Sequence, residues 1–74
     1  MSADVKPGQI YREDDMDLWV VLKVIAERTD TWVKIVRCGE AGAPLKDRYI
    51  SQRALEVLQR DISRGVWRLV GEAA

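Results

Sequence analysis

Five aromatic side chains are the residues of this chain best suited to binding a partner. They are Tyr11, Trp19, Trp32, Tyr49 and Trp67. Each falls in a segment rich in branched or apolar residues, where a β-strand is predicted. Tryptophan offers a large contact area and is enriched at the energetic hot spots of protein interfaces. The aromatic placement therefore favours a binding protein, provided that some indoles lie outside the core.

Two neighbouring predicted strands carry more apolar surface than one core face needs. If residues 18–25 and 31–38 pair as a hairpin, Leu22 lies opposite Ile35 and Val24 lies opposite Val33. The other face then carries Trp19, Val21, Ile25, Trp32 and Val36, interrupted by Lys23 and Lys34. We therefore predict docking of a protein partner, or self-association, through Trp19, Val21, Lys23, Trp32 and Lys34. The equally open alternative is that the helix or the closing strand covers this face.

A set of arginines towards the C-terminus suggests a second function. They are Arg48, Arg53, Arg60, Arg64 and Arg68. These cations could hold a nucleic-acid backbone while Trp67 and Tyr49 stack on bases, which makes a nucleic-acid-binding barrel the alternative prediction. Twelve basic and twelve acidic residues cancel to a net charge of zero. This balance favours the competing interpretation of the arginines as a solvated rim.

Catalytic and metal-binding chemistry has few candidates. The chain has no histidine and one cysteine, Cys38, so it lacks a zinc ligand set and a histidine base for a thiol nucleophile. The acidic residues within 13–17 lack the spacing and central glycine of a calcium loop, and we expect a solvated loop there. Gly39 and Gly42 are not followed by the Gly-Lys-Ser/Thr of a phosphate loop. We therefore expect a non-enzymatic protein without cofactor or metal, in which Cys38 packs as a small apolar residue.

The secondary structure that positions these residues follows from apolar alternation and turn chemistry. Pro7 and Gly8 predict a turn into a first short strand at Ile10 and Tyr11. Further strands are expected over residues 18–25, 31–38, 46–50 and 66–70. Ser51 is the predicted N-cap of a helix that ends at Gly65 and buries Ala54, Leu55, Leu58 and Ile62. The prediction is a mainly β fold: a small five-stranded SH3-like barrel, or a strongly bent antiparallel sheet, with one α-helix before the last strand.

The opening Pro7-Gly8-x-Ile10-Tyr11, followed by an apolar second strand, resembles the start of small SH3-like barrels. These include KOW-type modules of transcription proteins and the MazF-like family of toxin endoribonucleases. The arrangement is also similar to small uncharacterised proteins of actinobacteria and their phages. The resemblance implies an SH3-like fold, with RNA cleavage as a third functional alternative, and carries no family site residues onto this chain.

The length of 74 residues indicates one small domain. A domain of this size buries only about 60% of the surface that its unfolded chain exposes, so binding or self-association would add stability. We expect flexible ends over residues 1–5 and 71–74. The lone cysteine and the short apolar runs favour a cytoplasmic location.

Overall fold

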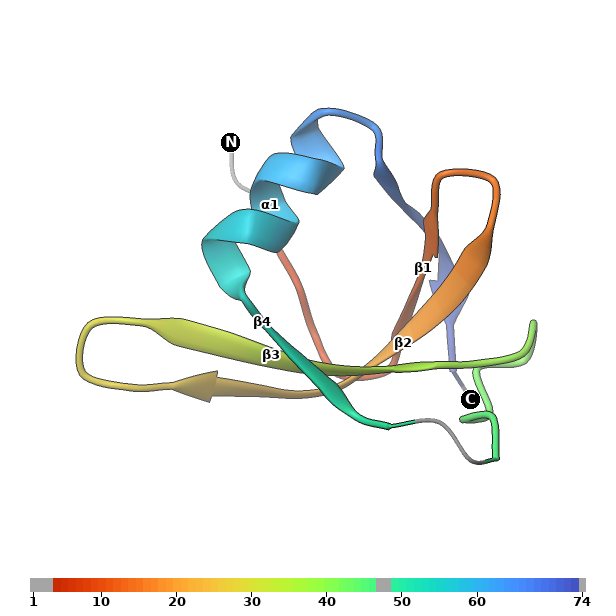
Figure 1. Ribbon diagram of the computed structural model, residues 1–74, viewed down its shortest axis with the longest axis horizontal. Helices are drawn as coiled ribbons and strands as arrows, with labels where there is room; N and C mark the ends of the chain where they lie inside the picture. Colours follow the sequence, from red (N-terminus) through yellow and green to blue (C-terminus); the bar gives the residue numbers. More distant parts are fainter. Residues whose placement is uncertain (1–3, 47–48, 74) are drawn as a thin grey trace.

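Five strands and one helix make up the fold of the computed structural model, which describes residues 4–46 and 49–73. In chain order they are β1 (Gln9–Glu13), β2 (Asp17–Ala26), β3 (Thr31–Arg37), β4 (Ser51–Ala54), α1 (Leu55–Ser63) and β5 (Trp67–Glu72). The strands form one antiparallel sheet in the order β4-β3-β2-β1-β5 (Figure 1). The predicted mainly β class, with one helix before the last strand, is confirmed.

The helix divides the sheet into two different faces. α1 follows β4 directly and lies over one side of the sheet before the chain returns to β5 (Figure 1). We call this side the helix face and the opposite side the outer face. Within the described residues no ladder joins β4 to β5, so the bent sheet is open at both edges.

The β2–β3 hairpin is the longest pair of strands, and its tip projects beyond the rest of the sheet (Figure 1). The turn lies at residues 27–30, as predicted, and the backbone N–H of Glu27 donates to the carbonyl of Asp30 at 2.7 Å. We call residues 23–34 the arm. Because the arm extends past its neighbours, much of its surface lies outside the two apolar clusters of the fold.

A β-bulge separates the arm from the rest of β2. Val24 pairs with Val33 as predicted, but Ile35 pairs with Val21 and not with Leu22. The register shift falls between Val21 and Lys23, which leaves Leu22 as the extra residue, 37% exposed. The predicted pairing of Leu22 with Ile35 is therefore wrong. A bulge adds one residue to one strand. Side chains an even number of residues apart, which normally share a face, therefore lie on opposite faces when the bulge is between them.

The bulge moves Trp19 and Val21 onto the helix face, where they are 8% and 1% exposed. The cluster on this face comprises Val5, Tyr11, Trp19, Val21, Val33, Ile35, Leu58 and Trp67. Leu58 of α1 is fully buried, and Leu55 and Ile62 pack beside it, as the helical periodicity predicted. Trp19 and Val21, which were expected on an exposed docking face, are therefore buried beneath the helix.

A second apolar cluster lies on the outer face and is covered by the loop that follows β3. It comprises Ile10, Val20, Val36 and Cys38. Gly42 of this loop has φ +84°, and a Cβ added there would lie 2.8 Å from the Cβ of Ala73 and 2.9 Å from Cδ1 of Ile10. The loop therefore packs closely against the sheet. Cys38 has the expected packing role, and burial raises the pKa of its thiol.

The segment before the helix differs from the prediction. Ser51 begins β4 rather than capping the helix, and Ala54 occupies the N-cap without a side-chain hydrogen bond. Residues 49–50 are not in a strand, and residues 47–48 lie outside the described residues. The local sequence favours a helix start at residues 51–54. Their backbone groups instead pair with β3, which satisfies their hydrogen bonding.

Both ends of the described chain have contacts with the rest of the fold. Gly8 has φ +90° in the expected Pro7-Gly8 turn. Val5 is buried in the helix-face cluster, and Gly71 continues β5. The N–H of Ala73 donates to the carbonyl of Gly8 at 2.6 Å. Val5, Gly71 and Ala73 thus have contacts within the fold, while residues 1–3 and 74 lie outside the described part.

Candidate functional site

A network on the helix face is centred on Glu13, the last residue of β1. Oε1 of Glu13 accepts a hydrogen bond from Nε1 of Trp19 at 3.2 Å. Oε2 accepts from Nε1 of Trp67 at 3.1 Å and from Nη1 of Arg53 at 3.3 Å. Burial raises the pKa of this carboxyl, but the three hydrogen bonds and the charge of Arg53 outweigh burial and hold the pKa below its ordinary value.

Arg53 reaches this network from β4. Its guanidinium carbon lies 5.1 Å from the ring centroid of Trp19 and 5.4 Å from that of Trp67. The two indoles stack with their centroids 6.2 Å apart. Cation–π attraction and the ion pair with Glu13 thus hold the Arg53 guanidinium against the two indoles. Arg53 was predicted to bind a nucleic-acid backbone, but here its guanidinium serves an internal cluster.

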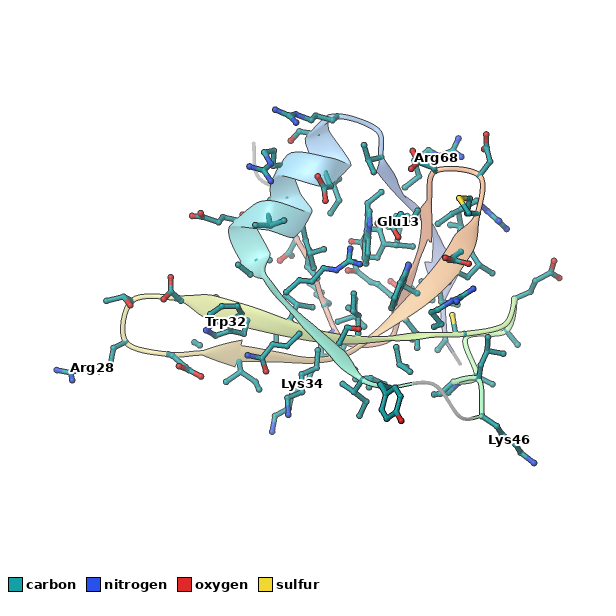
Figure 2. The ribbon with its side chains drawn as sticks, viewed as in Figure 1. Glu13, Arg28, Trp32, Lys34, Lys46 and Arg68 are labelled. Atoms are coloured by element: carbon teal, nitrogen blue, oxygen red, sulfur yellow. The ribbon has the colours of Figure 1, made fainter. Side chains whose placement is uncertain are left out.

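The other predicted arginines lie in different places. Arg68 donates to Oδ1 of Asp15 at 3.1 Å and to the carbonyl of Asp14 at 3.0 Å, beside the β1–β2 turn (Figure 2). Arg60 and Arg64 are exposed on α1 and at its C-cap, and Arg48 lies outside the described residues. The structure therefore does not gather the described arginines into one binding surface.

The outer face of the arm retains the distal half of the predicted docking face. Lys23 pairs directly with Lys34, and Ile25 pairs directly with Trp32. We call these four residues the arm patch. Ile25 and Trp32 are half-buried, and neither belongs to the helix-face cluster or the outer-face cluster. Figure 2 shows the side chain of Lys34 extending from β3 on the side away from α1.

The two lysines of the arm patch have no counter-charge in the described part of the chain. Neither side chain forms an ion pair or a hydrogen bond there. Like charges directly opposite each other on a sheet repel. The pair therefore leaves two ammonium groups free to interact with an anion from outside.

The strand pairings also show on which face of the sheet each charged strand residue lies. The outer face carries Arg12, Lys23, Lys34 and Arg68. The helix face carries Glu13, Asp17, Arg37, Arg53 and Glu72. Among the described strand residues, every charge on the outer face is thus positive, although the whole chain is neutral.

A polar cleft of about 210 Å³ lies between the arm tip and the first turn of α1. It is lined by Thr29, Asp30, Thr31, Ala54, Leu55, Glu56 and Gln59. Asp30 and Glu56 make the cleft acidic, in contrast to the outer face of the arm. No group of three or more potential metal ligands occurs among residues 4–46 and 49–73.

Glu13 is the residue that sequence reasoning missed. Its place in an acidic run predicted a solvated loop, which is wrong because β1 extends to Glu13. The available signal was alternation: Glu13 lies two residues after Tyr11, and so on the same buried face. Tyr11 itself is 2% exposed and donates to Oε1 of Gln9 at 2.9 Å.

Comparison of the chain with protein-family models, curated proteins and solved structures finds no match. The helix in the described residues is too short to cross a membrane.

Proposed function

We propose that this protein is a non-enzymatic protein-interaction module that docks through the arm patch. The observation that supports this proposal is the combination of an uncompensated Lys23–Lys34 pair with an adjacent Ile25–Trp32 pair outside both apolar clusters. Within the chain, this arrangement leaves like charges close together and apolar area in contact with water. A partner would neutralise the charge of the two lysines and cover the Ile25–Trp32 pair.

The arm patch is the centre of the proposed interface. A stable interface buries about 800 Å² on each partner, which is more than four side chains provide. Leu22, in the bulge, and Gln52, opposite Lys34 on β4, are exposed and adjoin the patch. These two residues border the Lys23–Lys34 row and would form part of the rim of the interface.

Site-specific photo-crosslinking in lysate of the native host tests the proposal. A photoreactive amino acid at position 52 reports on the rim, and one at position 60, exposed on α1, is the matched control. We expect the position-52 probe to capture a protein that the position-60 probe does not capture. Added unlabelled wild-type protein should compete for this capture, whereas the Trp32→Ala variant should compete at least tenfold less well.

Equal capture from both positions, or equal competition by the folded Trp32→Ala variant, would contradict the proposal. Capture of nucleic acid from position 52 would instead support the nucleic-acid alternative, with the arm lysines in place of the dispersed arginines. Circular dichroism of each variant establishes that the fold is retained. We expect no RNA cleavage by the purified protein.

A further inference from the structure

The arm patch has a defined chemistry that bears on the kind of partner it would take. The Lys23–Lys34 row and the Ile25–Trp32 row lie two residues apart along the strands. At about 3.4 Å per residue, the charged and apolar rows are about 7 Å apart. Cross-strand partners have Cβ atoms about 5 Å apart, so one anionic group can approach both ammonium groups at once.

The positive charge on the outer face of the arm is confined to the lysine row and does not form a continuous track. Beyond the lysine row comes the apolar row, and beyond that the tip carries Glu27 and Asp30 together with Arg28 (Figure 2). A nucleic-acid strand presents a phosphate at every nucleotide and is bound by a groove that follows its backbone. The carboxylates at the tip would repel such a strand. One isolated anion beside an apolar group fits the patch better.

We propose that the arm patch takes an acidic protein segment. A glutamate or aspartate of the segment lies between Lys23 and Lys34, and an apolar side chain about 7 Å away lies against Trp32 and Ile25. This inference rests on the proposed function and specifies the chemistry of its partner. Binding removes the repulsion between the two lysines and covers the half-buried indole.

Peptide selection on the full-length protein tests the inference. A displayed library of random twelve-residue peptides is selected against immobilised wild-type protein, and enriched peptides are synthesised. We expect these peptides to combine an aspartate or glutamate with a nearby apolar residue. Their affinity should fall at least tenfold for the Lys23→Glu/Lys34→Glu variant. It should change less than twofold for the matched Arg60→Glu/Arg64→Glu variant, which makes the same charge change on exposed residues of α1 and its C-cap.

Charge exchange supplies the decisive comparison. Replacing the acidic residue of a selected peptide with lysine should abolish binding to the wild type and restore binding to the Lys23→Glu/Lys34→Glu variant. Enrichment of neutral or basic peptides, equal affinity for the double variant, or no enrichment at all would overturn the inference. So would tighter binding of a twelve-nucleotide oligothymidylate that is lost in the same double variant.

The two proposals can fail separately. If the crosslinked native partner still depends on Trp32 but binds the Lys23→Glu/Lys34→Glu variant as tightly as the wild type, the docking surface stands and the acidic chemistry is wrong. If peptides bind only at the cleft between the arm tip and α1, both the acidic-segment inference and the arm-patch proposal fail. Circular dichroism of the double variant shows that the loss of binding does not arise from unfolding.

Discussion

Glu13 shows how one side chain can organise the interior of a small domain. Its two carboxylate oxygens accept hydrogen bonds from both buried indoles and from Arg53. Without Glu13, the N–H groups of Trp19 and Trp67 would lack these acceptors in a buried setting. The network explains why two of the three tryptophans belong to the core and not to a binding surface.

The pH dependence of stability should report on Glu13. Its pKa is lower in the folded protein than in the unfolded chain, so its charged form stabilises the fold above the unfolded pKa. This contribution is lost as the pH falls through the lower folded pKa. We expect Glu13→Gln to reduce the free energy of unfolding by about 1–3 kcal/mol at pH 7. The difference between variant and wild type should shrink at pH 3.

Urea denaturation of both proteins at pH 7 and pH 3 measures this effect. Glu40→Gln, a change of an exposed loop carboxylate, is the control and should follow the wild type. A destabilisation by Glu13→Gln that is equally large at both pH values would show that the carboxylate charge does not contribute.

At the level of secondary structure, one extra residue in β2 decides which side chains are buried and which remain on the surface. On the arm side of the bulge, Lys23 and Lys34 remain on the outer face. On the other side, Trp19 and Val21 lie under α1. The predicted docking face is thus split between the core and the surface, and only its distal half remains accessible.

Alanine substitutions on the two sides of the bulge test the register. Val21 is 1% exposed and Leu22 is 37% exposed. We expect Val21→Ala to lower the free energy of unfolding by about 2 kcal/mol, because it leaves a cavity in the core. Leu22→Ala should cost less than about 1 kcal/mol, since the removed methyl groups are partly solvated. Equilibrium denaturation in urea measures both values. A larger cost for Leu22→Ala than for Val21→Ala would favour the regular register without a bulge.

The Lys23–Lys34 pair gives a second prediction for the strands. Lys23→Glu converts a repulsive cross-strand pair into an attractive one, and we expect a gain of about 0.2–1 kcal/mol in the free energy of unfolding. Lys46→Glu, on an exposed loop residue, is the control. Thermal denaturation at low and high salt should show that the gain decreases with ionic strength. A gain in stability together with a loss of partner binding would show that the lysine serves binding rather than folding. Equal destabilisation by both substitutions would contradict the repulsive pairing.

Across the whole molecule, 74 residues bury apolar clusters on both faces of one sheet. α1 covers one face, and the loop after β3 covers part of the other. A domain of this length has a free energy of unfolding of about 4–11 kcal/mol. Losing the packing of α1 or of this loop against the sheet would therefore remove much of the stability.

The tryptophans should differ sharply in their contribution to this total. Trp67 is 1% exposed and belongs to the helix-face cluster, so Trp67→Ala should cost about 3–5 kcal/mol, a large part of this total. Trp32→Ala should cost less than about 2 kcal/mol, because its indole lies outside both clusters. Thermal denaturation followed by circular dichroism gives the comparison, with Trp67→Phe as a milder core variant. If Trp32→Ala destabilises the protein as much as Trp67→Ala does, Trp32 is a core residue and the docking proposal loses its support.

Much of this protein can be predicted from local sequence patterns. Alternation and turn residues located the Pro7-Gly8 turn, the hairpin tip at residues 27–30 and the amphipathic helix. They also predicted the pairing of Val24 with Val33 on the arm. These features depend on neighbours within a few residues or on a single short hairpin, so the sequence carries their signals directly.

Only the tertiary structure decided which residues face solvent. The bulge at Leu22 leaves no clear local signal, because it depends on how β2 bends to pair with β1 and β3 at once. The position of β4 depends on hydrogen bonding to β3, which local propensity does not register. The sequence by itself therefore determined the fold class and the presence of a Trp-bearing hairpin that carries Lys23 and Lys34. Long-range packing determined that Trp19 and Val21 are core and that Lys23, Ile25, Trp32 and Lys34 remain as one surface.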